Sequence, residues 1–287
     1  MTSSRHVLRI VAVVLTVLVL ILGLTVMLCK AFASAQQASP PASSYLFFDD
    51  FNGDSLDPAM WNVVLGNGCP DNCGWGNAEL ECYTAGNFHV MNGSLLIYST
   101  FHQENTNCYD GNGDFVGTTN WTSAKLNTQG KMSLAPDCDP VFVEAKIKVP
   151  TTMGSWPAFW MLPEKGAWCQ DGEIDVMKHK NNDSEICMTT WYSSNKNECN
   201  HAHFAQNISN VNDWHVYRVE WGCDYITWNI DGIDLYTWDY STTPFTGTPF
   251  TKSFYIILNL AIGGNFPGDT VDIVESVMAI DYVKAYW

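Results

Sequence analysis

The sequence predicts an all-β fold in which two antiparallel sheets stack as a β-sandwich, preceded by a hydrophobic N-terminal helix. Short runs that alternate apolar and polar residues follow one another from about residue 45, and helical periodicity is almost absent there. Aromatic residues make up 13% of the chain and charged residues 15%, which suits a β-protein better than a helical bundle. So many short strands in one domain indicate two stacked sheets with jelly-roll connections.

The N-terminus carries a long apolar segment. Residues 10–28 are apolar apart from two threonines. About 20 apolar residues can span a bilayer, whereas a typical signal peptide has roughly 7–15. We therefore expect residues 1–30 to be a retained signal-anchor. The alternative is a signal peptide cleaved after the small residues 33–35, and a buried core helix fits poorly. Both main alternatives place the remaining chain in the secretory pathway or outside the cell, with this helix as its sole membrane contact.

A linker and one domain follow the apolar segment. Residues 31–44 are rich in Ala, Ser, Gln and Pro, which is typical of a linker. The domain is expected to fill residues 45–287, with hairpin turns at Asn92-Gly93 and Asp231-Gly232. The predicted strands are residues 88–90, 94–100, 123–126, 141–149, 158–162, 173–177, 185–192, 215–221, 225–230, 233–238, 254–261 and 276–286.

Net charge and cysteine content narrow the classes of partner. The formal net charge of −16 argues against nucleic acid and anionic membrane surfaces, and leaves a neutral polymer such as a polysaccharide. Ten cysteines predict an oxidising compartment, several disulfides and at least one unpaired thiol. The sequence does not fix their pairing. Without a Cys-x-x-Cys pair, a zinc site has weak support.

Two acids stand one residue apart in an apolar run, as Glu173-Ile174-Asp175-Val176. Strand side chains alternate between faces, so Glu173 and Asp175 are expected on one face while Ile174 and Val176 enter the core. Two neighbouring carboxylates repel each other. One of them should therefore be protonated or hydrogen-bonded, and such a pair is a candidate for acid–base or nucleophilic chemistry.

Several separated motifs accompany this pair. In order along the chain they are residues 75–80 (Trp-Gly-Asn-Ala-Glu-Leu), 122–126, 144–150, 154–163, 214–221, 258–268 and 281–284. From about residue 47 to the C-terminus, this ordered set resembles glycoside hydrolase family 16, the laminarinase-like endo-β-1,3(4)-glucanases. The resemblance implies a concanavalin-like jelly roll.

The family signature is Glu-x-Asp-x-x-Glu, and the resemblance implies a role for each of its positions. Glu173 matches the nucleophile of a retaining endo-hydrolase of β-1,3- or mixed-linkage β-glucan, and Asp175 matches its supporting neighbour. In the family, a β-bulge after the Asp returns the sixth residue, the acid/base, to the same face. Here the sixth residue is Lys178. The alternative for the acid pair is two solvated carboxylates on an outer strand face.

Lys178 makes impaired catalysis the leading expectation. An ammonium group with an ordinary pKa of about 10.4 is a weak proton donor at neutral pH and is no base while charged. It is instead expected to form an ion pair with Glu173 and Asp175. If the bulge is absent, strand alternation brings His179 to the acid face as a substitute proton donor.

The resemblance also implies sugar contacts. Trp75, Trp156 and Trp191 are candidate platforms, because the C–H faces of pyranose rings stack on indole. The alternative for each is packing in the core. Asn77 and Lys125 are candidate polar contacts, with Lys125 standing where the family usually has Arg, which donates a fork of hydrogen bonds.

Other positions near these motifs receive different assignments. Trp160 is expected in the core. Thr190 stands where the family usually carries a histidine close to the catalytic centre. His201 and His203 are expected in a polar loop as surface residues.

A structural calcium ion away from the site is a further expectation from the resemblance, while no cofactor is required for the reaction itself. The matching positions are Asp50, the carbonyl of Gly93 and Asp281, because oxygen ligands suit calcium. The alternative is that these acids are simply solvated.

The sequence thus predicts a monomeric protein that recognises a β-glucan polysaccharide or oligosaccharide and is impaired as a hydrolase. The alternative is an active retaining endo-β-glucanase or transglycosylase that uses Glu173 and a substitute proton donor. A structural or adhesion domain that binds no glycan has little support.

Overall fold

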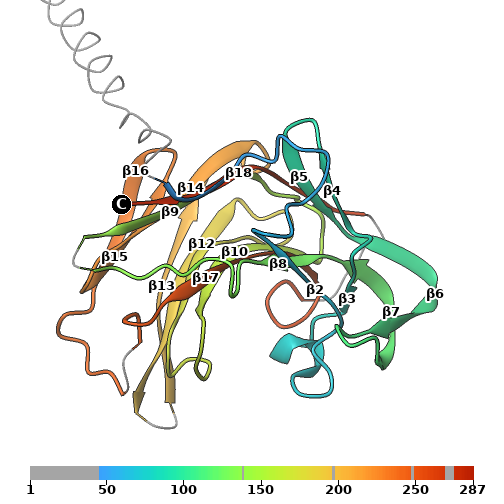
Figure 1. Cartoon of the computed structure of the whole chain (residues 1–287), viewed down its shortest axis with the longest axis horizontal. Coiled ribbons are helices and arrows are strands. Elements are labelled where there is room, and N and C mark those ends of the chain that lie inside the picture. Colours follow the sequence, from blue (N-terminus) through green and yellow to red (C-terminus); the bar gives the residue numbers. More distant parts are fainter. Residues whose placement is uncertain (1–44, 138, 196–197, 247–248, 269–274) are drawn as a thin grey trace, which may run out of the picture. The chain divides into compact units, whose positions relative to one another are not determined.

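The computed structural model describes residues 45–287 apart from residues 138, 196–197, 247–248 and 269–274. Two stacked sheets make up most of the described chain, and a small third sheet flanks them at one end (Figure 1). The predicted all-β sandwich is confirmed. The predicted N-terminal helix and linker, residues 1–44, lie outside the described residues. Within the described part of the chain, no helix is long and apolar enough to cross a membrane.

The larger sheet has eight strands. Seven of them follow the order β16-β15-β14-β9-β18-β5-β4, and β1 pairs with β18 outside this path. The strands are β1 (Tyr45–Asp49), β4 (Phe88–Met91), β5 (Ser94–Tyr98), β9 (Val141–Lys148), β14 (Trp214–Trp221), β15 (Tyr225–Ile230), β16 (Ile233–Asp239) and β18 (Val277–Tyr286).

The second sheet has seven strands in the order β13-β12-β11-β10-β17-β8-β2. Its strands are β2 (Asn62–Val64), β8 (Lys125–Asn127), β10 (Ser155–Pro163), β11 (Glu173–Lys178), β12 (Glu185–Asn195), β13 (Glu198–Asn207) and β17 (Phe254–Ile262). All its pairings are antiparallel.

The third sheet departs from the purely antiparallel expectation. It consists of β3 (Glu81–Tyr83), β6 (Thr100–Tyr109) and β7 (Phe115–Ser123), and β3 runs parallel to β7. Just before it, the chain forms a short 3-10 segment, η2 (Cys73–Gly76). This sheet and η2 wall off one end of the seven-stranded sheet (Figure 1).

The core lies between the two large sheets. Along β9, the alternate residues Val141, Val143, Ala145 and Ile147 point inward and are fully buried. All nine residues of β17 are buried, because the core covers one face of this central strand and the side chains described below cover the other. We call the face of the seven-stranded sheet that points away from the core the site face.

The predicted strands all correspond to parts of observed strands, and both predicted hairpin turns are present. Asn92 and Asp231 have φ angles of 54°, and a glycine with positive φ follows each of them, as two-residue hairpins require. Strands β1, β2, β3 and β13 and most of β6 and β7 were not predicted. Some of these are only three residues long, and others are polar on both faces. The polar loop predicted for His201 and His203 is wrong, because both residues lie on the edge strand β13.

Three disulfides link the described residues, which confirms that some of the cysteines are paired, while the oxidising compartment stays a prediction. They join Cys69 to Cys73, Cys82 to Cys108, and Cys169 to Cys199. Cys187 is a buried free thiol.

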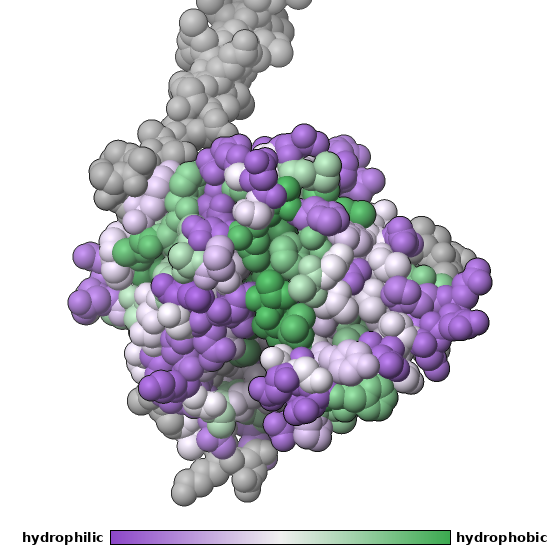
Figure 2. Space-filling model, turned by 45° about the vertical axis from the view of Figure 1, so that its right-hand side comes forward, coloured by the Kyte–Doolittle hydropathy of each residue, from purple (hydrophilic) through white to green (hydrophobic). Residues whose placement is uncertain are grey.

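The face of the domain that Figure 2 shows is mostly polar. Its polar side chains surround a narrow band of apolar side chains. Large apolar side chains that are more than half exposed are few, and Trp168 is one of them with 57% of its surface exposed. The indole of Trp168 lies beside the acid pair, as its hydrogen bond to Glu173 shows.

Candidate functional site

The acid pair lies on β11, and a β-bulge sets which side chains share its face. Asp175 pairs with Trp160 of β10, whereas Met177 pairs with Phe159, so Val176 is the extra residue. Val176 and Met177 both enter the core as a result. Lys178 returns to the site face beside Glu173 and Asp175, as two ion pairs show. The bulge expected from the sequence is therefore present.

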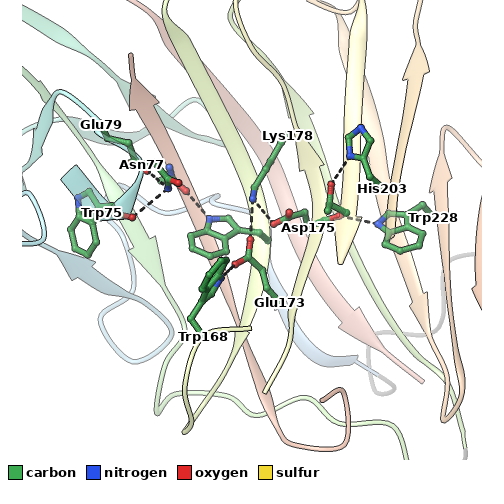
Figure 3. A network of polar contacts seen from close by, with 12 residues as sticks. Trp75, Asn77, Glu79, Trp168, Glu173, Asp175, Lys178, His203 and Trp228 are labelled. Carbon is green, nitrogen blue, oxygen red and sulfur yellow. Dashed lines mark hydrogen bonds and ion pairs between the residues drawn. The ribbon is translucent and has the colours of Figure 1, made fainter. Parts of the chain in front are cut away.

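Lys178 bridges the two acids. Its Nζ lies 3.0 Å from Oε1 of Glu173 and 2.7 Å from Oδ1 of Asp175. The three side chains are 16%, 6% and 1% exposed, respectively. Figure 3 shows the ammonium group pointing between the two carboxylates. The predicted ion pair is thus observed, and the reading of the acids as solvated surface groups is wrong.

Burial and the lysine charge give the two carboxyl groups different protonation behaviour. Burial by itself raises the pKa of Glu173, but the Lys178 charge and hydrogen bonds outweigh it and hold that pKa below its ordinary value. Burial and the neighbouring Glu173 charge raise the pKa of Asp175 well above its ordinary value. Burial opposes charge on Lys178, yet the two acids raise the pKa of its ammonium group. The arrangement therefore favours ionisation of Glu173 over ionisation of Asp175 and keeps Lys178 charged.

Trp168 is a site residue that the sequence reasoning missed. Its indole Nε1 donates a hydrogen bond of 2.7 Å to Oε2 of Glu173 (Figure 3). Its ring lies 5.7 Å from that of Trp191, which lies 4.7 Å from His201. The signal available in the sequence was an indole five residues before Glu173. The bond itself depends on how the loop folds back, which no local pattern predicts.

Trp160 is not a core residue, contrary to the prediction. It lies on the site face opposite Asp175, and its Nε1 donates a 2.7 Å hydrogen bond to Oδ1 of Asn259. The ammonium groups of Lys178 and Lys125 lie 5.4 and 5.2 Å from its ring centre. Alternation along β10 already gives this face, because its neighbours Phe159 and Met161 both enter the core. Two cations against one indole are a stabilising arrangement.

His179 does not face the acids. It is fully buried, and its Nε2 lies 2.8 Å from the carbonyl oxygen of Asp183. Burial lowers the pKa of the imidazole, partly offset by this hydrogen bond. The predicted alternative in which His179 supplies the proton depended on an absent bulge and is therefore wrong.

The residue that faces Asp175 from the next strand is Thr189. Thr190, which the resemblance matched to a histidine near the catalytic centre, does not face the acids. Thr190 pairs with the core residue Ile174 and is fully buried, whereas Thr189 pairs with Asp175. Directly opposed residues share a face of the sheet. The hydroxyl of Thr189 lies 3.0 Å from Nδ1 of His203, so an imidazole from β13 approaches the acid pair through this threonine (Figure 3).

The other end of the site face carries Trp75, Asn77 and Lys125. The Lys125 ammonium lies 4.0 Å from the Trp75 ring centre and 5.8 Å from that of Tyr83. Lys125 is 9% exposed, and among the described residues its ammonium has no hydrogen-bond acceptor. Burial lowers its pKa, against the opposing charges of nearby acids. Asn77 Nδ2 donates to Oε1 of Glu79 at 3.0 Å.

A second pair of acids, the half-buried Glu79 and the fully buried Glu81, lies near these residues. Tyr83 donates to Oε2 of Glu79 at 3.2 Å, and the Ile262 amide donates to Oε2 of Glu81 at 2.7 Å. Burial and the neighbouring Glu79 charge raise the pKa of Glu81 well above its ordinary value. Asn259 donates to the Tyr83 hydroxyl at 3.0 Å, which connects this pair to Trp160. Glu81 is fully buried, so it supports the wall of the site and does not reach a ligand.

The remaining predicted platforms differ in exposure. Trp191 lies directly opposite Glu173 across β11 and β12 and is partly exposed. Trp156 also lies outside the core cluster, but it is only 8% exposed, with the Phe266 ring 5.0 Å away. Trp191 and Trp75 are therefore better placed than Trp156 to meet a ligand.

The three predicted calcium positions lie away from the acid pair. Oδ2 of Asp281 lies 2.7 Å from Nζ of Lys146, and the oxygens of Asp50 accept hydrogen bonds from Asn52. A Cβ added at Gly93 would lie 3.2 Å from Oδ1 of Asn52, so Gly93 lies beside this loop. Asp281 thus forms an ion pair with Lys146, and Asp50 accepts hydrogen bonds from Asn52. The oxygens therefore do not fit the converging set that calcium requires, and calcium binding stays a prediction.

Chemically, the site offers an ionised carboxylate between an indole and an ammonium group, on a face lined with aromatic rings. Such a site suits uncharged polyols, whose hydroxyls meet the polar groups while ring faces meet the indoles. The two-sheet fold and this face together define a β-sandwich protein of the carbohydrate-active class.

Comparisons with known proteins give the family. The sequence profile of Glycosyl hydrolases family 16 matches residues 98–284. The chain belongs to this family.

Several similar proteins are named for β-glucan. "Glucan endo-1,3-beta-glucosidase A1" of Niallia circulans is 35% identical over 264 residues, which is 83% of this chain and 37% of that relative's length. The solved endo-beta-1,3-glucanase of Pyrococcus furiosus superposes with a TM-score of 0.72 at 34% identity, covering 84% of this chain and 93% of that one. The "Beta-1,3-glucan-binding protein" of Penaeus monodon is 29% identical over 175 residues, 50% of this chain and 47% of that protein.

Proposed function

We propose that this protein binds β-1,3- or mixed-linkage β-glucan on the site face and is impaired as a hydrolase, because Lys178 occupies the position of the acid/base. One observation carries the proposal. The Lys178 ammonium lies within 3.0 Å of Glu173 and 2.7 Å of Asp175, between the two acids that the family signature supplies.

Retaining hydrolysis needs two carboxyl groups about 5–5.5 Å apart, one to attack the sugar and one to exchange protons with the leaving oxygen. Lys178 offers no such exchange, because the two acids raise the pKa of its ammonium group. Loss of general acid–base help typically costs about 10²–10⁴ in rate. The ion pair also occupies Oε1 of Glu173, so the nucleophile is restrained as well.

Glucan binding is supported independently of the chemistry. Trp168, Trp191 and Trp75 present partly exposed indoles along the site face, and the buried Lys125 ammonium has no hydrogen-bond acceptor among the described residues. Sugar hydroxyls are suitable acceptors. The relative from Penaeus monodon is named for binding β-1,3-glucan, while those from Niallia circulans and Pyrococcus furiosus are named as glucanases.

The alternative is an active retaining glucanase or transglycosylase with Glu173 as nucleophile. The lowered pKa of Glu173 favours it, since the attacking carboxylate must be ionised. The proton donor is its weak point, because His179 faces the core and Asp175 is only 1% exposed.

The proposal extends to location and assembly. We expect a monomer, secreted or held by its N-terminal segment, since the disulfides fit an oxidising compartment.

The test compares three proteins for hydrolysis of laminarin and lichenan, with binding to insoluble glucan measured in parallel. They are the wild type, Lys178→Glu and Lys178→Gln. Lys178→Glu restores a carboxyl group at this position, whereas Lys178→Gln removes the same charge without adding an acid. We expect the wild type and Lys178→Gln to bind without turnover, and Lys178→Glu to gain at least 10²-fold in rate.

The outcomes separate the alternatives. Turnover by the wild type at rates typical of glucanases refutes the impaired-enzyme proposal. Equal gains in Lys178→Glu and Lys178→Gln would show that the charge, and not the missing proton donor, limits the reaction. Absence of binding in all three proteins refutes glucan recognition. An aryl glycoside whose leaving group needs no proton tests Glu173 alone, since product there requires only a competent nucleophile.

A further inference from the structure

In the loop between β10 and β11, the exposed side chain of Trp168 contacts the buried carboxylate of Glu173. Trp168 is 57% exposed, yet its Nε1 donates to Oε2 of Glu173, which is 5% exposed. Ordering an exposed loop side chain costs conformational entropy. The net free energy of a single hydrogen bond offsets that cost only in part. The structure therefore needs some other feature that holds Trp168 in place.

Covalent and ionic contacts hold this loop on both sides of the tryptophan. The residue after Trp168 is Cys169, which forms a disulfide with Cys199 on β13. Further along, Asp171 pairs with Lys252 and accepts the Ala167 amide at 2.8 Å. The ion pair fixes the end of the loop. The disulfide fixes the backbone directly at the tryptophan.

The disulfide also spans the site face in a specific direction. Strand β13 lies two strands beyond β11, with β12 between them. Glu173, Trp191 and His201 lie in one row across these three strands. Cys199 pairs with Ser193, two residues from Trp191 on β12, so the disulfide from Cys169 lies beside this row. The Trp168 ring lies 5.7 Å from the Trp191 ring. The same disulfide therefore holds both the Trp168–Trp191 ring contact and the hydrogen bond from Trp168 to Glu173.

We propose that the Cys169–Cys199 disulfide is a positioning element of the glucan site, which holds Trp168 against Glu173 and Trp191. The expected effect of the disulfide on glucan affinity rests on the glucan binding proposed above. Its effect on Trp168 itself is independent of any ligand. Without the tie, Trp168 leaves Glu173, Oε2 of that carboxylate loses its indole donor, and the aromatic pair separates.

A second disulfide offers a matched control. Cys82–Cys108 closes 26 residues against 30 for Cys169–Cys199, and both have a Cα–Cα distance of 5.7 Å. Disulfides that close loops of similar length stabilise a fold by similar amounts in the chain-entropy account. Cys82 and Cys108 join β3 to β6, away from the Trp168 loop. A loss of stability alone would thus affect both variants alike.

The first measurement uses the protein without ligand. The Trp168 indole N–H resonance is assigned in NMR spectra by its absence from Trp168→Phe. In Cys169→Ser/Cys199→Ser, we expect this resonance to move to the position of a solvent-exposed indole and to exchange faster with water. In Cys82→Ala/Cys108→Ala it should stay in place. An unchanged resonance in the first variant overturns the proposal.

The second measurement is affinity for laminari-oligosaccharides in a double-mutant cycle. We expect Cys169→Ser/Cys199→Ser to weaken binding roughly 2- to 12-fold, the range for an aromatic contact. Adding Trp168→Ala to that variant should weaken binding no further, because both changes remove the same platform. Multiplying losses would show that the disulfide acts without Trp168 and would overturn the proposal.

The two measurements keep the proposals apart. If the wild type binds no glucan, the proposed function fails and the NMR measurement still decides the positioning role. If the double serine variant does not fold, brief treatment of Cys69→Ser/Cys73→Ser with a thiol reductant replaces it. That background lacks the other exposed disulfide, and Cys199 is exposed while Cys82 and Cys108 are buried.

Discussion

Replacing Lys178 with methionine tests the ion pair directly. The methionine keeps most of the aliphatic stem and removes the ammonium group that contacts Glu173 at 3.0 Å and Asp175 at 2.7 Å. The acids are 6% and 1% exposed, so water cannot replace the lost partner. Breaking a buried pair by removing one partner typically costs about 3–5 kcal/mol. For a domain of this size, that corresponds to a fall in Tm of roughly 6–20 °C.

A matched control uses an exposed ion pair with the same geometry. Lys146 Nζ lies 2.7 Å from Oδ2 of Asp281, and both side chains are 36% exposed. Surface pairs of this kind contribute about 0–1 kcal/mol. Lys146→Met should therefore change the unfolding free energy by less than about 1 kcal/mol. Chemical denaturation of the wild type and both variants measures the difference.

The pH dependence gives the prediction a sign. In the wild type, the lowered pKa of Glu173 gives stability that is present at neutral pH and is lost as pH falls through that pKa. In Lys178→Met, we expect the pKa of Glu173 in the folded protein to rise above its value in the unfolded chain. As pH falls, the folded protein then binds this proton at a higher pH than the unfolded chain does, and its free energy of unfolding increases. The deficit of the variant should therefore shrink between pH 7 and pH 5. A deficit below about 1 kcal/mol at pH 7, or one that grows on acidification, refutes the reasoning.

Three further predictions concern single side chains. Lys125→Met should change thermal stability little, because the relieved burial of the ammonium offsets its lost contacts with the Trp75 and Trp160 rings. It should weaken oligosaccharide binding by about 1.5–3 kcal/mol; calorimetry measures both, and unchanged affinity contradicts a sugar contact. His179→Ala should lower the unfolding free energy by about 1–3 kcal/mol through its lost bond to Asp183, with glucan affinity unchanged; a change in affinity would contradict its placement. Burial and Glu185 raise the pKa of the Cys187 thiol to about 11, so iodoacetamide should label it at pH 8 only after denaturation, which peptide mass spectrometry detects.

The sequence predicted the elements that follow from local pattern. Alternation along residues 173–176 correctly sent Glu173 and Asp175 to one face and Ile174 and Val176 to the core. Turn chemistry located both hairpins, because Asn-Gly and Asp-Gly tolerate positive φ. These features depend on neighbours in sequence, which is the information that a pattern contains.

Features that depend on pairing between distant strands were harder to predict. Alternation alone would place Lys178 on the core side, and the resemblance to family 16 supplied the bulge. Trp160 was misplaced although alternation with the core residues Phe159 and Met161 puts it on the site face. Thr190 was misplaced because the face of β12 depends on its register with β11. The hydrogen bond from Trp168 needs the disulfide to Cys199, whose pairing no single sequence fixes.

The bulge at Val176 has an evolutionary consequence. It gives position 178 a backbone that pairs normally with Ala158 and Cys187, while its side chain stands apart from the core. Selection can therefore exchange that side chain without repacking the sandwich. On the function proposed here, lysine and glutamate at this position separate a lectin-like protein from an enzyme. Their codons differ by one nucleotide, so a lineage with this scaffold can cross that boundary in either direction by a point mutation.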